Sequence, residues 1–156
     1  MPIPKYTART TLAAEIARVD RQRFNEAVAD GFYTCAPKTV RGKVRRFEVN
    51  DIVTLWVYGR LLNKGMSQRV AGRSACELHA LLVQFPETER AVQVTNSFGS
   101  HVWFRPEDFD FDSTHMGGAD IEDFHVWSLK NKRNQFIAEL REEARTLGRD
   151  EEDEDE

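Results

Sequence analysis

A short polar segment between Asp20 and Gly31 places the tightest constraint on how this chain can fold. Aspartate is a favoured N-cap residue, and glycine easily takes the left-handed conformation that ends a helix, so RQRFNEAVAD is predicted to be a short helix. The preceding segment, TLAAEIARV, has apolar residues at helical spacing and can be capped by Thr10 or Thr11. Two short helices joined by a tight corner are a candidate helix-turn-helix.

The second predicted helix has one narrow apolar stripe, formed by Phe24, Ala27 and Val28. Its other positions present amide side chains framed by arginines, and such groups read base edges and bind phosphates in protein–DNA complexes. An ordinary amphipathic surface helix has a similar face, so the segment alone leaves both interpretations open. The candidate groove-contacting residues are Arg21, Gln22, Arg23 and Asn25.

A strongly basic stretch follows, with five cations among the nine residues 38–46 and no acid before Glu48. Strand-forming residues on both sides of Gly42 predict a small β-hairpin over residues 40–47 with a basic tip. Residues 50–64 then repeat apolar side chains as a helix does, up to Gly65. This order of elements is that of a winged helix-turn-helix, whose wing lies along the phosphate backbone. The candidate phosphate contacts are Lys38, Arg41, Lys43, Arg45 and Arg46.

The chain carries a series of spaced landmarks: Asp20, Gly31-Phe32-Tyr33, Arg45-Arg46-Phe47, Asp51, Leu55 and Gly65-Met66-Ser67. In these residues and their spacing, about residues 11–85 resemble the DNA-binding domain of the MerR family of transcriptional regulators. The resemblance implies a recognition helix in the major groove, a wing on the backbone and a homodimer. Where the family has Arg-Tyr-Tyr-Glu in its recognition helix, this chain has Asn25-Glu26-Ala27-Val28, so of the family's contacts only the wing arginine, at Arg45, transfers.

The sequence pattern of the second half of the chain predicts one more hairpin and two helices. Ser74 and Glu77 have the spacing of a capping box, which predicts a helix that begins there and ends before Pro86. Alternating apolar residues on both sides of Asn-Ser-Phe-Gly, residues 96–99, predict a hairpin that sets Val92 and Val94 against Val102 and Phe104.

Residues 121–148 are predicted to form a long helix that ends at Gly148. Its apolar stripe is expected either to form the seam of a dimer or to pack on the chain's own hairpin. This stripe consists of Phe136, Ile137, Leu140, Ala144 and Leu147.

Composition excludes several classes of protein. Apolar residues make up 40% and charged residues 31% of the chain, and no apolar run approaches the ~18 residues of a membrane span. The N-terminus lacks the apolar core of a secretory signal, so we expect a cytoplasmic protein without a membrane partner. Cys35 and Cys76 are far apart with no CxxC, and we expect two small buried hydrophobic side chains rather than a disulfide or a thiolate metal site.

The net charge of −4 hides an asymmetry. Residues 1–73 contain 14 Lys and Arg against 6 Asp and Glu, whereas residues 74–156 contain 8 against 20. The first half is therefore suited to an anionic partner, and the seven acids of residues 150–156 are expected to be disordered. The four histidines lack metal-ligand spacing, and no nucleotide-binding or nucleophile motif is present, so we expect no catalytic site, metal or cofactor.

We therefore predict an α+β, mainly helical protein with an N-terminal winged helix-turn-helix and a small C-terminal region of β-hairpin plus helix. Residues 1–85 would bind DNA, residues 86–148 would serve dimerisation or partner docking, and residues 149–156 would be the acidic tail. The predicted function is sequence-specific binding of double-stranded DNA by a homodimeric transcriptional regulator. The transcription machinery is a further predicted partner. Two alternatives stay open: an excisionase-like architectural DNA-binding protein, and a protein-interaction module with a basic face.

Overall fold

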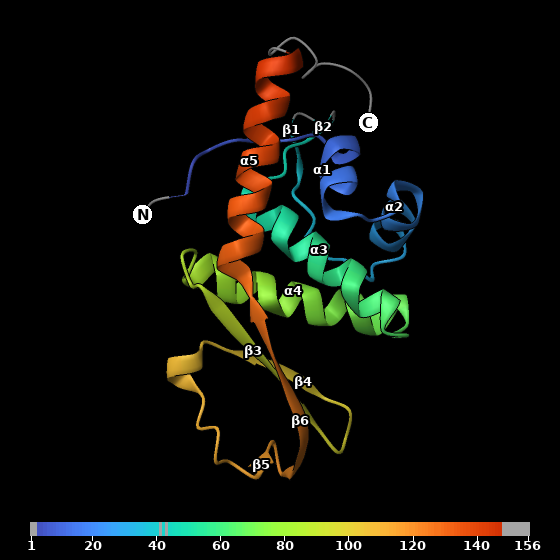
Figure 1. Cartoon of the computed structure of the whole chain (residues 1–156). Helices are drawn as coiled ribbons and strands as arrows, with labels where there is room; N and C mark the ends of the chain where they lie inside the picture. Colours follow the sequence, from blue (N-terminus) through green and yellow to red (C-terminus); the bar gives the residue numbers. More distant parts are fainter. Residues whose placement is uncertain (1–2, 41, 43, 148–156) are drawn as a thin grey trace.

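The computed structural model describes residues 3–40, 42 and 44–147, and it shows an α+β fold. In the described part of the chain, four helices and a small hairpin occupy one end, a four-stranded antiparallel sheet occupies the other, and the last helix returns to the helical end (Figure 1). The predicted acidic tail lies outside the described residues. The elements are α1 (Thr10–Ala17), α2 (Arg21–Ala29), β1 (Thr39–Val40), β2 (Val44–Arg45), α3 (Val49–Asn63), α4 (Gln68–Gln84), β3 (Arg90–Asn96), β4 (His101–Phe104), the 3-10 helix η1 (Pro106–Asp108), β5 (His115–Met116), β6 (Ala119–Ser128) and α5 (Leu129–Leu147).

The predicted ends of α2 are confirmed. The Asp20 carboxylate accepts a hydrogen bond from the backbone N–H of Arg23 at 2.9 Å, which satisfies one of the amide groups that a helix start leaves unpaired. Gly31 has a φ of 77°, which is the left-handed conformation that ends many helices. Glycine adopts this conformation without the steric cost that a Cβ would add. The segment between these residues therefore forms a helix of fixed length.

Aromatic rings pack the helical end of the molecule around α3. Phe24 of α2 makes edge contacts with Tyr33, with ring centroids 5.0 Å apart, and with Phe47, at 5.8 Å. Tyr33 in turn contacts Tyr58 of α3 at 5.1 Å. Because all four rings are buried, α2, the loop after it and the end of the hairpin share one core with α3.

Helix α4 corrects the prediction that a new helix begins at Ser74. One continuous helix spans Gln68–Gln84, and its N-cap is Ser67, whose hydroxyl accepts from the backbone N–H of Val70 at 3.2 Å. The Ser74–Glu77 spacing therefore lies inside the helix. Gly72 allows the segment at Phe32 to cross α4 closely, because a Cβ at this position would lie 2.1 Å from the carbonyl oxygen of Phe32.

The sheet has the strand order β4-β3-β6-β5. The predicted register of the hairpin is confirmed, since Val92 pairs with Phe104 and Val94 pairs with Val102. The prediction of a helix from residue 121 was wrong: β6 occupies residues 119–128, and α5 begins only at Leu129. The physical reason is non-local, because β6 pairs antiparallel with β3 from Arg90 to Asn96. The C-terminal region is thus a four-stranded sheet plus a helix, rather than a hairpin plus a helix.

A buried hydrogen-bonded network fastens the sheet to α4. The side-chain amide of Gln93 donates to the hydroxyl of Ser74 at 3.0 Å, and the indole N–H of Trp103 donates to the carbonyl of Ser74 at 2.8 Å. The indole N–H of Trp127 donates to the amide oxygen of Gln93 at 3.2 Å. Since these groups are buried, each bond satisfies a polar group that would otherwise be costly to bury.

The apolar stripe of α5 packs inside its own chain. Phe136 is 1% and Leu140 3% exposed, and both belong to the core that contains the buried residues of α3. Ile137 is half-buried and Ala144 is exposed, while the side chain of Leu147 lies outside the described residues. Of the two expected roles, packing inside the chain therefore describes Phe136 and Leu140, and these two side chains are not available to form a dimer seam.

Arg133 locks the start of α5 in place. Its guanidinium donates from Nε to the Asn50 side-chain oxygen at 3.0 Å and from Nη1 to the Thr88 carbonyl at 3.1 Å. Asn50 also donates from Nδ2 to the Pro86 carbonyl at 3.0 Å. Burial lowers the pKa of Arg133, against the opposing effect of the nearby acids Glu87 and Glu89. Helix α3, the α4–β3 connection and α5 are thereby tied together.

Replacing Leu140 tests whether the stripe is core or seam. Leu140→Ala is expected to lower the free energy of unfolding by about 2–5 kcal/mol, because it leaves a cavity under α5. Urea denaturation measures this loss, and Asn134→Ala, at an exposed position of the same helix, is the matched control. A variant of undiminished stability that changes from dimer to monomer in sedimentation would instead identify the stripe as a seam.

Candidate nucleic-acid interface

The outer face of α2 presents every groove-contacting residue that the sequence predicts. Arg21, Gln22, Arg23 and Asn25 are exposed, whereas Phe24 and Ala27 are completely buried beneath them. The guanidinium of Arg21 also donates to the hydroxyl of Thr11 at 3.2 Å, which joins α2 to the start of α1. Helix α2 is thus held by its apolar stripe and leaves two guanidinium groups and two amide groups accessible to solvent.

The basic hairpin is short and well anchored at its base. Thr39 pairs with Arg45, and a bridge between Ala8 and Phe47 adds the N-terminal segment beside it, with backbone hydrogen bonds of 3.0 and 2.7 Å. Gly42 at the tip has a φ of 70°, as a tight hairpin turn requires. The hairpin lies with α1 and α2 at the end of the molecule away from the four-stranded sheet (Figure 1).

The predicted phosphate-contacting residues differ in their surroundings. Lys38 is exposed just before β1. Arg45 and Arg46 are half-buried, and the guanidinium of Arg45 donates to the carbonyl of Pro37, which secures the loop that leads into β1. Part of the hydrogen-bonding capacity of Arg45 is therefore used inside the hairpin. Arg41 and Lys43 lie outside the described residues.

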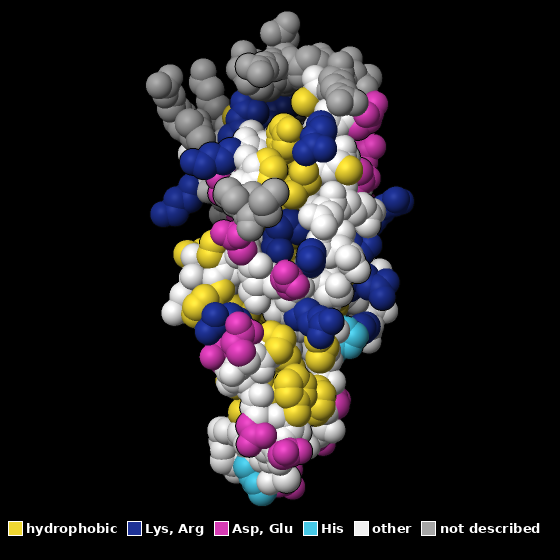
Figure 2. Space-filling view, turned by 60° about the vertical axis from the view of Figure 1, so that its left-hand side comes forward, with side chains coloured by type: hydrophobic (Ala, Val, Ile, Leu, Met, Phe, Trp, Pro, Cys, Tyr) yellow, Lys and Arg dark blue, Asp and Glu magenta, His cyan; other side chains and the backbone are white. Residues whose placement is uncertain are grey.

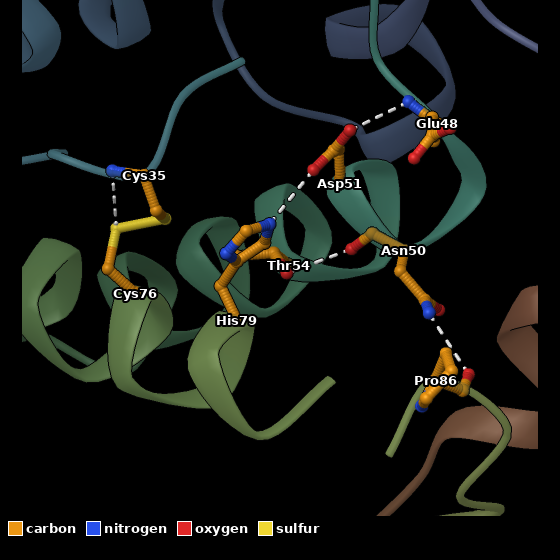
Figure 3. A network of polar contacts seen from close by, with 8 residues as sticks. All are labelled: Cys35, Glu48, Asn50, Asp51, Thr54, Cys76, His79 and Pro86. Atoms are coloured by element: carbon orange, nitrogen blue, oxygen red, sulfur yellow. Dashed lines mark hydrogen bonds and ion pairs between the residues drawn. A yellow bond between two sulfur atoms is a disulfide. The ribbon is translucent and has the colours of Figure 1, made fainter. Parts of the chain in front are cut away.

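Cys35 and Cys76 form a disulfide, which corrects the prediction of two free buried thiols. The backbone N–H of Cys35 also donates to the Sγ of Cys76 at 3.2 Å (Figure 3). The two residues are 41 positions apart, and they meet because the loop after α2 crosses α4 at Gly72, one helical turn before Cys76. The loop that ends the candidate recognition helix is therefore covalently joined to α4.

Asp51 and His79 form the best-defined titratable pair beside this crossing. The Nε2 of His79 lies 3.0 Å from Oδ1 of Asp51, and Oδ2 of Asp51 accepts from the backbone N–H of Glu48 at 2.8 Å (Figure 3). Asp51 thus completes the capping box of α3 while it binds a side chain of α4. The contact between His79 and Asp51 therefore holds the start of α3 against α4.

The described residues contain neither a group of three or more His, Cys, Asp and Glu side chains that could hold a metal ion nor a helix long and apolar enough to cross a membrane. A scan against protein-family models and a search of the curated proteins find no match to this chain.

Removal of the disulfide is expected to destabilise the protein without changing its fold. For a loop closed over 41 residues, the chain-entropy model gives a loss of up to about 4 kcal/mol in the free energy of unfolding. Urea denaturation of the Cys35→Ser/Cys76→Ser variant, with and without reductant, measures the loss. The variant should be insensitive to reductant, and identical curves for the oxidised native chain and the variant would contradict the crosslink.

Proposed function

We propose that this chain is a sequence-specific double-stranded DNA-binding protein that regulates transcription in the cytoplasm as a homodimer. The observation that carries the proposal is the exposed face of α2, where Arg21, Gln22, Arg23 and Asn25 stand together above a buried apolar stripe. Side-chain amides can pair with the edge of adenine, and arginines bind guanine edges or phosphates. The major groove of DNA is wide enough to admit an α-helix, so α2 could bring these side chains to the base edges.

The remaining helices and the basic hairpin support this proposal. The order α1, α2, β1, β2 and α3 agrees with the order of elements in a MerR-like winged helix-turn-helix. In this arrangement α2 would enter the major groove, and the hairpin would follow the adjacent phosphates with Lys38, Arg41, Lys43, Arg45 and Arg46. Because Arg45 already donates to Pro37, it would both shape the hairpin and contact DNA.

Two-fold assembly would double the few base contacts that one small domain offers. Phe136 and Leu140 of the α5 stripe are buried in the core, so we propose that the subunits associate through another surface. An excisionase-like architectural protein would instead bind repeated sites in tandem, and the symmetry of the selected DNA distinguishes the two modes.

A protein-interaction module is the second candidate, and the outer face of the sheet favours it. Val102, Phe111, Phe124 and Val126 are 36–44% exposed on this face, close to Phe109. Figure 2 shows one group of hydrophobic side chains in the lower part of the visible face, with acidic side chains below it. Large exposed apolar surfaces of this kind commonly bind other proteins.

Selection of bound fragments from random genomic DNA, followed by two variants, tests the proposed function. Asn25→Ala is expected to lose about 1–3 kcal/mol of discrimination at one base position and to keep non-specific binding. Lys38→Ala is expected to weaken binding to all sequences alike and to reduce the slope of log affinity against log salt by about one unit. The different signatures separate base reading from phosphate binding.

Lys130→Ala is the matched control, because this lysine lies on α5 with its Nζ 3.7 Å from a carboxylate oxygen of Glu89. It should leave both the selected motif and the salt slope unchanged. If the native protein selects no motif, or if Asn25→Ala selects the native motif at full discrimination, α2 does not read bases. Tight binding of a protein partner together with no DNA affinity would favour the interaction module.

A further inference from the structure

A cleft of about 260 Å³ lies where the end of α3 meets the end of β6 and the first turn of α5. It involves none of the residues of α2 or of the hairpin, so it is separate from the proposed DNA-binding surface. Its volume is near the lower limit of small-molecule sites. The side chains that give it its chemical character are Trp56, Arg60, Lys64, His125, Trp127 and Lys132.

Three aromatic rings form the wall of this cleft. The ring of Trp56 is perpendicular to that of Trp127, with centroids 5.5 Å apart, and the ring of His125 lies 4.7 Å from that of Trp127. Trp127 is buried, whereas Trp56 is half-buried and His125 is exposed. Trp56 and His125 can therefore offer ring surface to a planar group that enters from solvent.

Positive charge converges on the same cleft. The Nζ of Lys64 lies 5.0 Å from the centre of the Trp127 ring, and the Nζ of Lys132 lies 5.0 Å from the centre of the Trp56 ring. Arg60 is the third cation of the wall, and among the residues that the structure describes no aspartate or glutamate lines the cleft. The N-terminus of α5 carries the partial positive charge of the helix dipole, and its first turn contains no acid that would neutralise this charge. The helix start therefore adds to the positive potential in the cleft.

The surroundings of His125 agree with this positive field. Burial lowers the pKa of His125, and Lys64 and Arg60 lower it further, while Asp123 on the same strand acts in the opposite direction. The lowered pKa favours the uncharged imidazole, and Arg60, Lys64 and Lys132 supply the positive charge of the cleft.

We propose that this cleft binds a small molecule in which an aromatic ring carries an anionic group, either a phosphate or a carboxylate. The anion would lie between the ammonium groups of Lys64 and Lys132, and the ring would stack on Trp56 or His125. Cation–π contact explains how the two lysines are held, but it leaves their charges without a counter-ion in the cleft. An anion supplies that counter-ion, and the ring retains the aromatic contact.

Calorimetric titration of the full chain with matched probes tests the proposal. The probes are adenosine 5′-monophosphate and indole-3-acetate, with adenosine and indole as neutral rings and ribose 5-phosphate and acetate as anions without a ring. At least one aromatic anion is expected to bind about tenfold more tightly than either of its halves. Comparison of the two anions distinguishes a phosphate site from a carboxylate site. The proposal is overturned if neither anion binds more tightly than its neutral ring.

Variants of single lysines locate the binding in the cleft. Lys64→Gln and Lys132→Gln should each weaken binding of the tighter aromatic anion by about tenfold, because each removes one charged partner. Lys130→Gln is the matched control, since this lysine lies two residues from Lys132 and outside the cleft. An equal loss in Lys130→Gln would show non-specific attraction and would contradict the proposal.

The native chain provides a second readout that does not depend on folding of the variants. A bound anion favours the charged imidazolium, so saturation with the tighter anion should raise the pKa of His125 in an NMR titration. His101, whose pKa is lowered mainly by its own burial, is not part of the cleft and should keep its midpoint. An unchanged midpoint at His125 would place the bound anion elsewhere.

Discussion

Burial of α3 on most of its surface is the constraint on which the rest of the structure depends. Nine of its 15 residues are buried, including Tyr58 in its second half. A helix that is apolar around most of its circumference cannot be covered by one neighbour, so it needs elements from several parts of the chain. Helix α1, the aromatic side chains of α2 and its following loop, helix α4 and helix α5 supply this cover. The surfaces exposed at α2 and at the cleft exist because those elements are fixed on α3.

The C-terminal half satisfies this constraint in an indirect way. The sheet first attaches to α4 through the buried network of Ser74, Gln93, Trp103 and Trp127. Strand β6 then runs back toward the helices and continues directly into α5, which covers α3 with Phe136 and Leu140. The polar network sets the direction of β6, and this direction determines where α5 begins.

Signals carried by a few neighbouring residues predicted the local structure well. The cap at Asp20, the stop at Gly31 and the pairing of Val92 with Phe104 depend on preferences that operate within a turn or a hairpin. Structure that depends on distant partners was not predictable in this way. Residues 121–128 form a strand because β3 lies beside them. Gly72 lies within α4 where the loop at residue 32 crosses the helix, and a Cβ there would collide with that loop. The exposed residues of α2 follow from one helical period, whereas the cleft combines residues of α3, β6 and α5 that no spacing in the sequence connects.

The Cys35–Cys76 disulfide joins the loop after α2 to α4, so its reduction could change the position of α2. Disulfides are uncommon in the cytoplasm, where reducing systems keep most thiols free, so the proposed location raises the question of what else holds the loop. Tyr33 is 2% exposed and contacts the rings of both Phe24 and Tyr58, and Gly72 lets the backbone at Phe32 lie directly against α4. These contacts involve residues beside Cys35 and do not require the sulfur–sulfur bond. The crosslink therefore fixes a loop that packing already positions, and the face of α2 is expected to keep its orientation when both thiols are reduced.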